Sequence, residues 1–406
     1  MKGYTATLPN GEAIIYVDRK RWLWILSLLY PLQPFFGIAM HSYTGNELWL
    51  LFPLLLNFGF GPILDALLGV DKNNPPEEVV MQLDRDHYYR WLTYAVVPLH
   101  YITLVGCAWY AATAPLSVWG VLSIAIVAGM TAGLAINTGH ELGHKNSRIE
   151  KILAKIVLAL PAYGHFTIDH NLGHHRNVST PDDPASSRMG ESIYRFAIRE
   201  IPGAFREAWG IEKDRLARRN MPVWHPRNLI LQSYALSAAF TIGLVVAFGL
   251  FMLPFLLVHH AFAYWQLTSA NYIEHYGLLR QRDENGKLER CEPHHSWNSN
   301  HIFSNLVLFH LERHSDHHAH PLRRYQSLRH FDGLPQLPNG YFGMYLLAYV
   351  PFLWFRAMDK RLLALPQVNG DLDEINIDPA AKPAIFLKYG RDKMAAPDLG
   401  NFSPGD

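Results

Sequence analysis

Long apolar runs constrain the fold of this chain more than any other feature of its sequence. A helix needs about 20 residues to cross the ~30 Å hydrocarbon core of a bilayer, and five runs reach that length. The last run is about twice as long and divides into two. The expected spans are residues 22–42, 47–70, 91–114, 117–139, 229–250 and 252–275. The pattern therefore predicts an all-α, polytopic membrane protein with about six transmembrane helices.

The distribution of positive charge predicts the orientation of these helices. The short connections SYTGNE and AATAPLS contain no Lys or Arg, whereas the N-terminus and the segments 70–90 and 140–227 are rich in basic residues. Connections with an excess of Lys and Arg stay on the cytoplasmic side. We therefore expect both termini and both long loops in the cytoplasm. The first run follows Lys20 and Arg21 without a small-residue cleavage site, which favours a retained span over a signal peptide.

The sequence predicts one domain followed by a tail. Residues 1–365 are expected to form a single membrane-embedded domain. Within it, segment 341–360 is aromatic with a basic end, which predicts a helix lying on the membrane surface rather than a seventh span. Residues 366–406 are rich in Pro, Gly and Asp without periodicity, which predicts an irregular linker or docking segment. With a net charge of +1 and no run of like charge, nothing indicates nucleic-acid binding.

Histidine is the residue type that points to chemistry in this chain, which contains 22 of them. Nine fall into four groups that the expected topology places on one membrane face. These are His140 and His144 in HELGH, His170, His174 and His175 in HNLGHH, His275 in NYIEH, and His314, His317 and His318 in HSDHH. Nine imidazoles are too many for one metal and suit two metals with about four or five ligands each. We therefore expect a cytoplasmic, histidine-rich di-metal cap. Neutral imidazole binds Fe, Cu, Zn and Ni, so the residues alone leave the metal open.

Spacing within the clusters predicts which side chains act together. Histidines four residues apart, such as His170 and His174, project from one helix face, and the adjacent His175 can reach a second metal. Carboxylates beside the histidines are expected to accept the second ring N–H of a metal-bound imidazole. These carboxylates are Glu141, Asp169, Glu274, Glu312 and Asp316.

Four segments resemble the bacterial integral-membrane alkane 1-monooxygenases, the AlkB hydroxylase family, within the superfamily of membrane fatty acid desaturases and hydroxylases. They are HELGHK, HNLGHHRNVSTPDDPASS, NYIEHYGLLR and RHSDHHAHPLRRYQSLRHFDGLPQLPNGY, and the likeness extends to about residue 360. Asp169 and Glu312 depart from the family pattern without touching a ligand position. The resemblance implies that the nine histidines hold two iron ions as a non-haem di-iron centre. It also implies hydroxylation of the terminal methyl of medium-chain n-alkanes with O2.

The resemblance further implies an electron donor and a location. Rubredoxin, served by a rubredoxin reductase, would deliver electrons in the bacterial inner membrane. A rubredoxin iron is held by two CxxC pairs, and this chain has only Cys107 and Cys291. The donor is therefore expected to be a separate protein or a fused rubredoxin domain. Because rubredoxins are acidic, a basic dock is expected near the histidines. The candidates are Lys145, Arg148, Lys151, Lys155, Arg313, Arg323, Arg324 and Arg329.

Three alternatives remain open at this stage. HELGH also satisfies the H-E-x-x-H pattern of zinc proteases, in which Glu141 would be the general base, but that function leaves seven clustered histidines unexplained. A membrane fatty-acyl desaturase or lipid hydroxylase on the same scaffold is the closer alternative. A metal transporter would instead space its histidines along the helices.

Hydrocarbon contacts discriminate by only ~1–3 kcal/mol per methylene, so a bulky side chain that closes the pocket is expected to select chain length. The candidates for this stop are Phe52, Phe58, Phe60 and Trp109.

Overall fold

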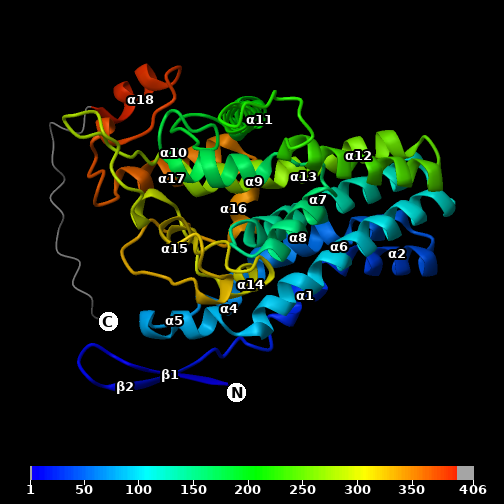
Figure 1. Cartoon of the computed structure of the whole chain (residues 1–406), viewed down its shortest axis with the longest axis horizontal. Helices are drawn as coiled ribbons and strands as arrows, with labels where there is room; N and C mark the ends of the chain where they lie inside the picture. The colour runs from blue at the N-terminus through cyan, green and yellow to red at the C-terminus, as the bar shows by residue number, and fades with distance from the viewer. Residues whose placement is uncertain (1, 391–406) are drawn as a thin grey trace.

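Long helices form the body of the structure, a computed structural model that describes residues 2–390 (Figure 1). The longest are α6 (His87–Thr113), α7 (Val118–Gly143), α11 (Ile193–Ala217), α12 (Leu229–Phe248) and α13 (Met252–His275). Helix α7 packs against α6, α13 and α8 (Arg148–Leu158), and its second half is almost entirely buried. It is therefore the central helix of the fold.

Small residues allow α7 and α13 to approach each other closely. A Cβ atom at Gly129 would lie 2.4 Å from the backbone oxygen of His259, and one at Gly133 would lie 2.6 Å from Cβ of Gln266. Either contact would push the helices apart, so glycine is required at both positions. Small residues at helix interfaces are typical of membrane proteins, in which backbones pack at short range.

Four helical segments within the described residues are long and apolar enough to cross a membrane. They are Glu47–Leu68, His87–Thr113, Val118–Gly143 and Leu229–Phe248. The first of these combines η2 (Glu47–Leu51), α3 (Phe52–Leu54), the π-helical η3 (Leu55–Phe60) and α4 (Gly61–Leu68). Four of the six expected spans are thus candidate membrane helices by length and composition.

The other two expected spans differ from a simple apolar helix. Segment 22–42 is divided into α1 (Ile25–Leu29), η1 (Tyr30–Leu32) and α2 (Gln33–Thr44), because Pro31 and Pro34 each remove a backbone donor. Segment 252–275 is one continuous helix, α13, but it carries polar residues such as His259, Gln266 and Asn271 that lower its hydropathy.

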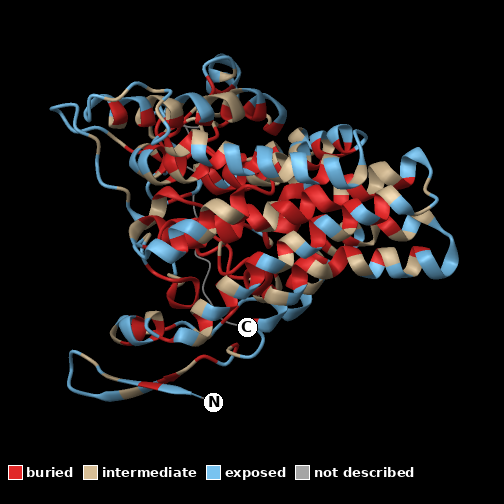
Figure 2. Cartoon of the chain, turned by 45° about the vertical axis from the view of Figure 1, so that its right-hand side comes forward, coloured by how far each residue is buried: buried red, intermediate tan, exposed pale blue. Residues whose placement is uncertain are grey.

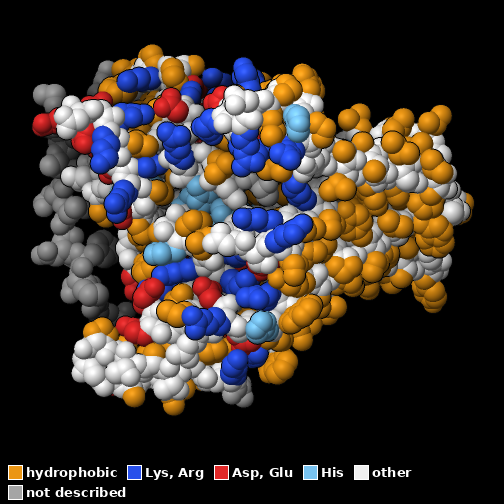
Figure 3. All heavy atoms as spheres, viewed as in Figure 1, with side chains coloured by type: hydrophobic (Ala, Val, Ile, Leu, Met, Phe, Trp, Pro, Cys, Tyr) orange, Lys and Arg blue, Asp and Glu red, His pale blue; other side chains and the backbone are white. Residues whose placement is uncertain are grey.

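The surface divides into an apolar end and a charged end. Figure 3 shows hydrophobic side chains covering the end at which α2, α6 and α12 terminate in Figure 1, and Lys, Arg, Asp and Glu gathered at the opposite end. In Figure 2, buried residues run through the middle of the bundle, while the outer faces of these helices are exposed. This division is what a chain partly embedded in lipid requires.

Short helices and loops cover the charged end. From the segment between α8 and α11 come α9 (Phe166–Ile168), the π-helical η4 (Asp169–His174) and α10 (His175–Asn177). From the segment after α13 come η5 (Pro293–His295), α14 (Ile302–Val307), α15 (His314–Ala319) and η6 (Tyr325–Ser327), and α5 (Glu77–Asp84) lies beside them. Most residues from 295 to 328 are buried, so the loops pack as a core of their own.

Three features differ from the sequence-based expectation. The N-terminus forms an antiparallel hairpin of β1 (Gly3–Thr7) and β2 (Ala13–Val17), in which Gly3 pairs with Val17. Segment 341–360, expected as one surface helix, is two helices, α16 (Tyr341–Ala348) and α17 (Pro351–Leu363), which meet at Pro351. Helix α16 is buried against α13 rather than exposed, because its aromatic side chains fill the core there.

The third difference concerns the predicted irregular tail. Its first part contains η7 (Leu372–Glu374) and α18 (Lys382–Tyr389), with Val368 and Ile375 buried. Single bridges join Ile377 to Met189 and Ile375 to Leu278. Residues 366–390 are therefore packed onto the body instead of being a loose linker, and residues 391–406 of the predicted tail lie outside the described residues.

Candidate metal centre and substrate cavity

The nine histidines expected as ligands lie together where α7 and α13 end, in two groups. In each group, one possible ligand atom per residue lies within 4.8 Å of all the others. The five-histidine group consists of His140, His144, His170, His175 and His317, and the four-histidine group consists of His174, His275, His314 and His318. All are buried except His175, which is partly exposed.

Ring nitrogens in the five-histidine group face one another at short range. The Nε2 atom of His317 lies 2.9 Å from that of His140 and 3.2 Å from that of His175. Two nitrogens in neighbouring positions on one metal, each bound at about 2.1 Å, lie roughly 3.0–3.4 Å apart. A ring nitrogen has either one proton or one lone pair, so a single hydrogen bond accounts for only one of the two contacts of His317.

The four-histidine group has the same geometry. The Nε2 atom of His314 lies 3.3 Å from that of His275 and 2.9 Å from that of His318. Two further nitrogens, Nε2 of His144 and Nε2 of His174, are buried without any hydrogen-bond partner. Burying a polar atom unpaired is costly, and a metal ion at each group would satisfy them. The residues present therefore fit two metal ions.

Local helix geometry decides which histidines share a group. His314 and His318 lie one α-helical turn apart on α15, as do His140 and His144 at the end of α7, and each pair shares a group. Helix η4 is a π-helix, whose wider turn and i→i+5 backbone hydrogen bonds change which side chains come together.

In the HNLGHH cluster, the pairing therefore differs from the expected one. His175 joins His170, with Nε2 atoms 3.2 Å apart, and His174 belongs to the other group. The expected partnership of His170 with His174 is corrected here, because that expectation assumed an α-helix.

Burial sets the charge state of these rings. It lowers the pKa of His170, His317 and His318 well below the ordinary histidine value, with further lowering from neighbouring histidines. Neutral rings keep a lone pair for a metal. His174 differs: burial lowers its pKa, but the Asp183 carboxylate outweighs this and raises it.

Asp183 is a functional residue that sequence reasoning missed. Its Oδ2 atom lies 2.9 Å from Nδ1 of His174, on the side of the ring away from the histidine group. A carboxylate in that position fixes the tautomer and the direction of a metal-binding ring. The sequence offers no signal that separates Asp183 from its neighbour Asp182, which is exposed.

The five carboxylates expected to play that part have other surroundings. Glu141 pairs with Lys145 at 3.2 Å, and Asp316 pairs with Arg323 at 2.9 Å. Glu312 accepts a hydrogen bond from the backbone N–H of Tyr341, and Oδ1 of Asp169 is buried without a hydrogen-bond partner. Glu274 alone contacts a grouped histidine: its Oε2 lies 3.4 Å from Nε2 of His314. That nitrogen faces the group, so Glu274 points toward the metal position.

Half of the basic residues expected at an exposed dock are buried in ion pairs. Arg313 pairs with Asp71 at 2.8 Å, and Asp71 also pairs with Lys20. Arg324 pairs with Glu150 at 2.7 Å.

Arg323 and Lys145 are likewise buried, paired with Asp316 and Glu141. Of these four cations, Arg323 also pairs with Glu77 on α5 and Arg324 reaches Glu150 on α8, and the expected role of all four in an exposed dock is corrected. Arg148 and Lys151 are exposed, and Lys155 and Arg329 are partly exposed.

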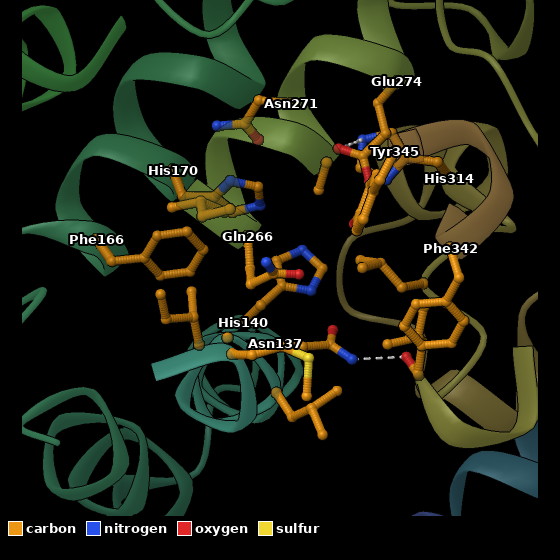
Figure 4. Close-up of a pocket in the computed structure, with 18 of the residues that line it drawn as sticks. Asn137, His140, Phe166, His170, Gln266, Asn271, Glu274, His314, Phe342 and Tyr345 are labelled. Carbon is orange, nitrogen blue, oxygen red and sulfur yellow. Dashed lines mark hydrogen bonds and ion pairs between the residues drawn. The ribbon is translucent and has the colours of Figure 1, made fainter. Parts of the chain in front are cut away.

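A mostly apolar cavity leads away from the histidines between α7, α13 and α16. His140, His170 and His314 line one end (Figure 4). The other walls are mostly apolar, with Met130, Leu134, Leu267 and Phe342 among them. A dry, shaped cavity beside a metal position is suited to holding a hydrocarbon.

The bulky side chains expected to close this cavity do not line it. Phe60 and Trp109 are exposed on the outer surface, and Phe52 is partly exposed. Phe58 lies one layer behind, with its ring centroid 6.4 Å from that of Phe342. Residues of α7 form part of the wall instead. The sequence alone does not identify them, because they depend on which face of α7 lies against α13.

Comparison with known proteins agrees with this site. The family model described as fatty acid desaturase matches residues 116–348, a range that includes all nine histidines. The chain is 52% identical to alkane 1-monooxygenase 1 of Alcanivorax borkumensis over 384 residues, or 94% of each chain. It is 54% identical to the alkane 1-monooxygenase of Ectopseudomonas oleovorans over 376 residues, or 92% of this chain and 93% of the relative. The hydroxylase component of the xylene/toluene monooxygenase of Pseudomonas putida is 29% identical over 252 residues, 61% and 64% of the two chains.

Proposed function

This chain belongs to the alkane 1-monooxygenase family, within the superfamily of membrane fatty acid desaturases and hydroxylases, and it is an enzyme that hydroxylates alkanes. From that premise we propose that it converts medium-chain n-alkanes to 1-alkanols by attack on the terminal methyl group. One alkane, one O2, two electrons and two protons give one alkanol and one water.

The observation that carries the proposal is the meeting of the two histidine groups with the apolar cavity. Three grouped histidines, His140, His170 and His314, form the end wall of a space whose other walls are mostly apolar, with a few polar side chains such as Asn137 and Gln266 among them. An alkane offers no charge or hydrogen bond to grip, so shape and dryness must hold it. A chain entering this cavity presents its end, rather than its middle, to the histidines.

We propose that the two groups hold two iron ions as a non-haem di-iron centre, with the nine histidines as ligands. Iron, when bound, would supply the activation of O2 that a strong methyl C–H bond requires. Imidazole suits iron among other metals, and the five-plus-four division suits two ions.

The protein residues prepare the site in three ways. Asp183 holds the ring of His174 through Nδ1, and Glu274 stands beside the metal-facing nitrogen of His314. The apolar walls exclude water, which protects a reactive oxidant from side reactions. The last turn of α7 places His140 at the cavity end, so that substrate and metal positions share one helix.

We further propose six membrane spans in a bacterial inner membrane, with residues 1–365 and the packed segment 366–390 as one domain and both termini in the cytoplasm. The apolar end of the surface and the histidines at the opposite end support this arrangement (Figure 3). Electrons would come from rubredoxin and its reductase. The chain's two cysteines cannot form a four-cysteine rubredoxin iron site, so that donor needs another domain or protein.

Metal analysis followed by turnover tests the proposal. Protein purified in detergent is analysed for iron, then given O2, rubredoxin, its reductase and either n-octane or a fatty-acyl lipid. We expect about two iron ions per chain and 1-octanol as the product. An unsaturated or hydroxylated acyl product without octanol would favour the desaturase alternative. Zinc in place of iron would contradict the di-iron centre.

A further inference from the structure

A continuous line of aromatic rings connects the five-histidine group to the protein surface. The ring of Phe166 stacks on that of His170 with centroids 4.9 Å apart, and Phe166 lies 6.0 Å from Tyr163. The Tyr163 ring in turn lies 4.3 Å from that of His165. Phe166, Tyr163 and His165 are all buried, so this part of the line is shielded from solvent.

The line continues from His165 along α11. His165 lies 5.4 Å from Phe205, Phe205 stacks on Trp209 at 6.0 Å, and Trp209 lies 5.3 Å from Trp224. Trp224 is 72% exposed. We call these six residues from Phe166 to Trp224 the aromatic chain. Every step between neighbouring rings is a direct ring contact.

A tyrosine–histidine pair stands beside the middle of the aromatic chain. The hydroxyl of Tyr234 lies 2.8 Å from Nδ1 of His165, and their rings are nearly parallel. Gly164 permits this approach, because a Cβ atom there would lie 2.8 Å from the side chain of Ser233. Burial lowers the pKa of His165 to about 4, so the ring is neutral at pH 7. Its Nε2 has no hydrogen-bond partner, and with the ring proton on Nε2 the Nδ1 atom accepts from the Tyr234 hydroxyl.

Packing alone does not account for this arrangement. Trp and Tyr gather at membrane interfaces, which explains Trp224 and Trp209. It does not explain a partly buried tyrosine hydrogen-bonded to a buried, neutral histidine, or ring contacts that reach a grouped histidine. A tyrosine gives up an electron readily only when a base takes its phenol proton, and the Tyr234–His165 pair provides that base.

On the premise of the proposed monooxygenase function, we propose that the aromatic chain is an escape route for oxidising equivalents that no substrate consumes. One electron passes from Tyr234 to the O2-oxidised metal that the histidine groups would hold, so that the metal is reduced by one electron; the Tyr234 O–H bond breaks, and the proton moves to Nδ1 of His165. Trp224 then gives one electron to the tyrosyl radical, which takes its proton back from His165. A soluble one-electron reductant such as a thiol restores Trp224.

The direction of flow follows from the chemistry of the rings. Tyrosine and tryptophan lose electrons only to strong oxidants, so a ring radical forms when a strong oxidant is present at the metal position and not during the ordinary delivery of electrons by a mild donor. The route is useful when O2 reacts without an alkane in the cavity. Met130 lines that cavity, and its thioether would otherwise be oxidised to the sulfoxide.

Uncoupled turnover tests the escape route. Iron-loaded protein is given O2, rubredoxin and its reductase without alkane, and samples are frozen for electron paramagnetic resonance. The variants are Tyr234→Phe and Trp224→Phe, which keep the ring packing. Trp119→Phe is the control, because Trp119 is 74% exposed on α7 and lies outside the aromatic chain.

We expect a tyrosyl or tryptophanyl radical signal in the wild type and the control that is lost or altered in both variants. Met130 sulfoxide per O2 consumed, measured by peptide mass spectrometry, should rise severalfold in the variants and not in the control. The initial rate of octane hydroxylation at saturating octane should stay unchanged. A wild type that makes octanol while all four proteins give equal radical and sulfoxide yields overturns the escape route alone. Slower hydroxylation in Trp224→Phe would mean that the rings carry incoming electrons, and this result would also overturn the escape route. Absence of octanol from the wild type would instead contradict the proposed function.

Discussion

His317 and His318 are neighbours in the chain but belong to different histidine groups. Nε2 of His317 lies 2.9 Å from Nε2 of His140, and Nε2 of His318 lies 2.9 Å from Nε2 of His314. Adjacent residues on a helix point about 100° apart, so α15 reaches both groups at once. His174 and His175 divide between the groups in the same way. These two covalent links hold the groups at a fixed separation.

Because of that division, single substitutions in one helix should empty different metal sites. His318→Ala leaves three histidines in its group, and His317→Ala leaves four in the other. We expect each variant to lose about one metal ion per chain, with a more complete loss in His318→Ala, and both to lose hydroxylation of octane. Metal content measured beside octanol formation checks this.

His320→Ala is the matched control for these variants. His320 follows the same helix, has a half-exposed side chain and contacts Asp316 rather than either group. It should keep both metals and most of the activity. Full activity in His317→Ala or His318→Ala would contradict the assignment of these residues as ligands.

Asp183→Asn should weaken metal binding at the four-histidine group. The carboxylate accepts from Nδ1 of His174 at 2.9 Å, and the loss of such a partner typically costs about 10–100-fold in metal affinity or activity. Competition with a chelator measures the affinity of each site. Asp182→Asn is the control, since Asp182 is exposed and pairs only weakly with Arg282 at 3.4 Å. Equal effects in the two variants would mean that Asp183 has no special hold on His174.

The sequence predicted that the nine histidines would lie together, because each cluster is short and its spacing can be read directly from the sequence. It could not predict how they divide, because an α-helix and a π-helix share the letters of HNLGHH and place different rings together. The apolar runs located the helices, but the interrupted first run shows that Pro31 and Pro34 reshape a segment whose composition alone predicts a simple span.

Partners from distant segments were the least predictable part of the site. Arg313 and Arg324 were expected on the surface because both are cations near a cluster. They are buried because Asp71 and Glu150, far away in sequence, reach them. Substrate contacts depend in the same way on which face of α7 meets α13, and this depends on packing rather than on composition.

Glu141→Gln separates a structural role from protease chemistry. Glu141 pairs with Lys145 in the interior, and breaking a buried pair by removing one partner costs about 3–5 kcal/mol. We therefore expect a lower thermal unfolding midpoint, unchanged metal content and no proteolysis in wild type or variant. The double variant Glu141→Gln/Lys145→Met should recover much of the stability, because no lone charge stays buried. Loss of metal in Glu141→Gln would instead assign this residue to the metal site.

Chain-length preference should respond to residues on α7 that line the cavity. Leu134 and Met130 lie six and ten residues before His140, which corresponds to about 9 and 15 Å along the helix axis. A tryptophan at the nearer position should block longer chains, and an alanine at the farther one should admit them. Leu134→Trp is expected to lower the rate with decane relative to hexane by about tenfold, since a methylene is worth ~1–3 kcal/mol. Met130→Ala should shift the optimum to longer alkanes.

Leu67→Trp, at a position 77% exposed on α4, serves as the control for added bulk. Competition between alkanes of different length, read from the alkanols formed, measures all three, and an unchanged product ratio in Leu134→Trp would show that substrate does not occupy this cavity.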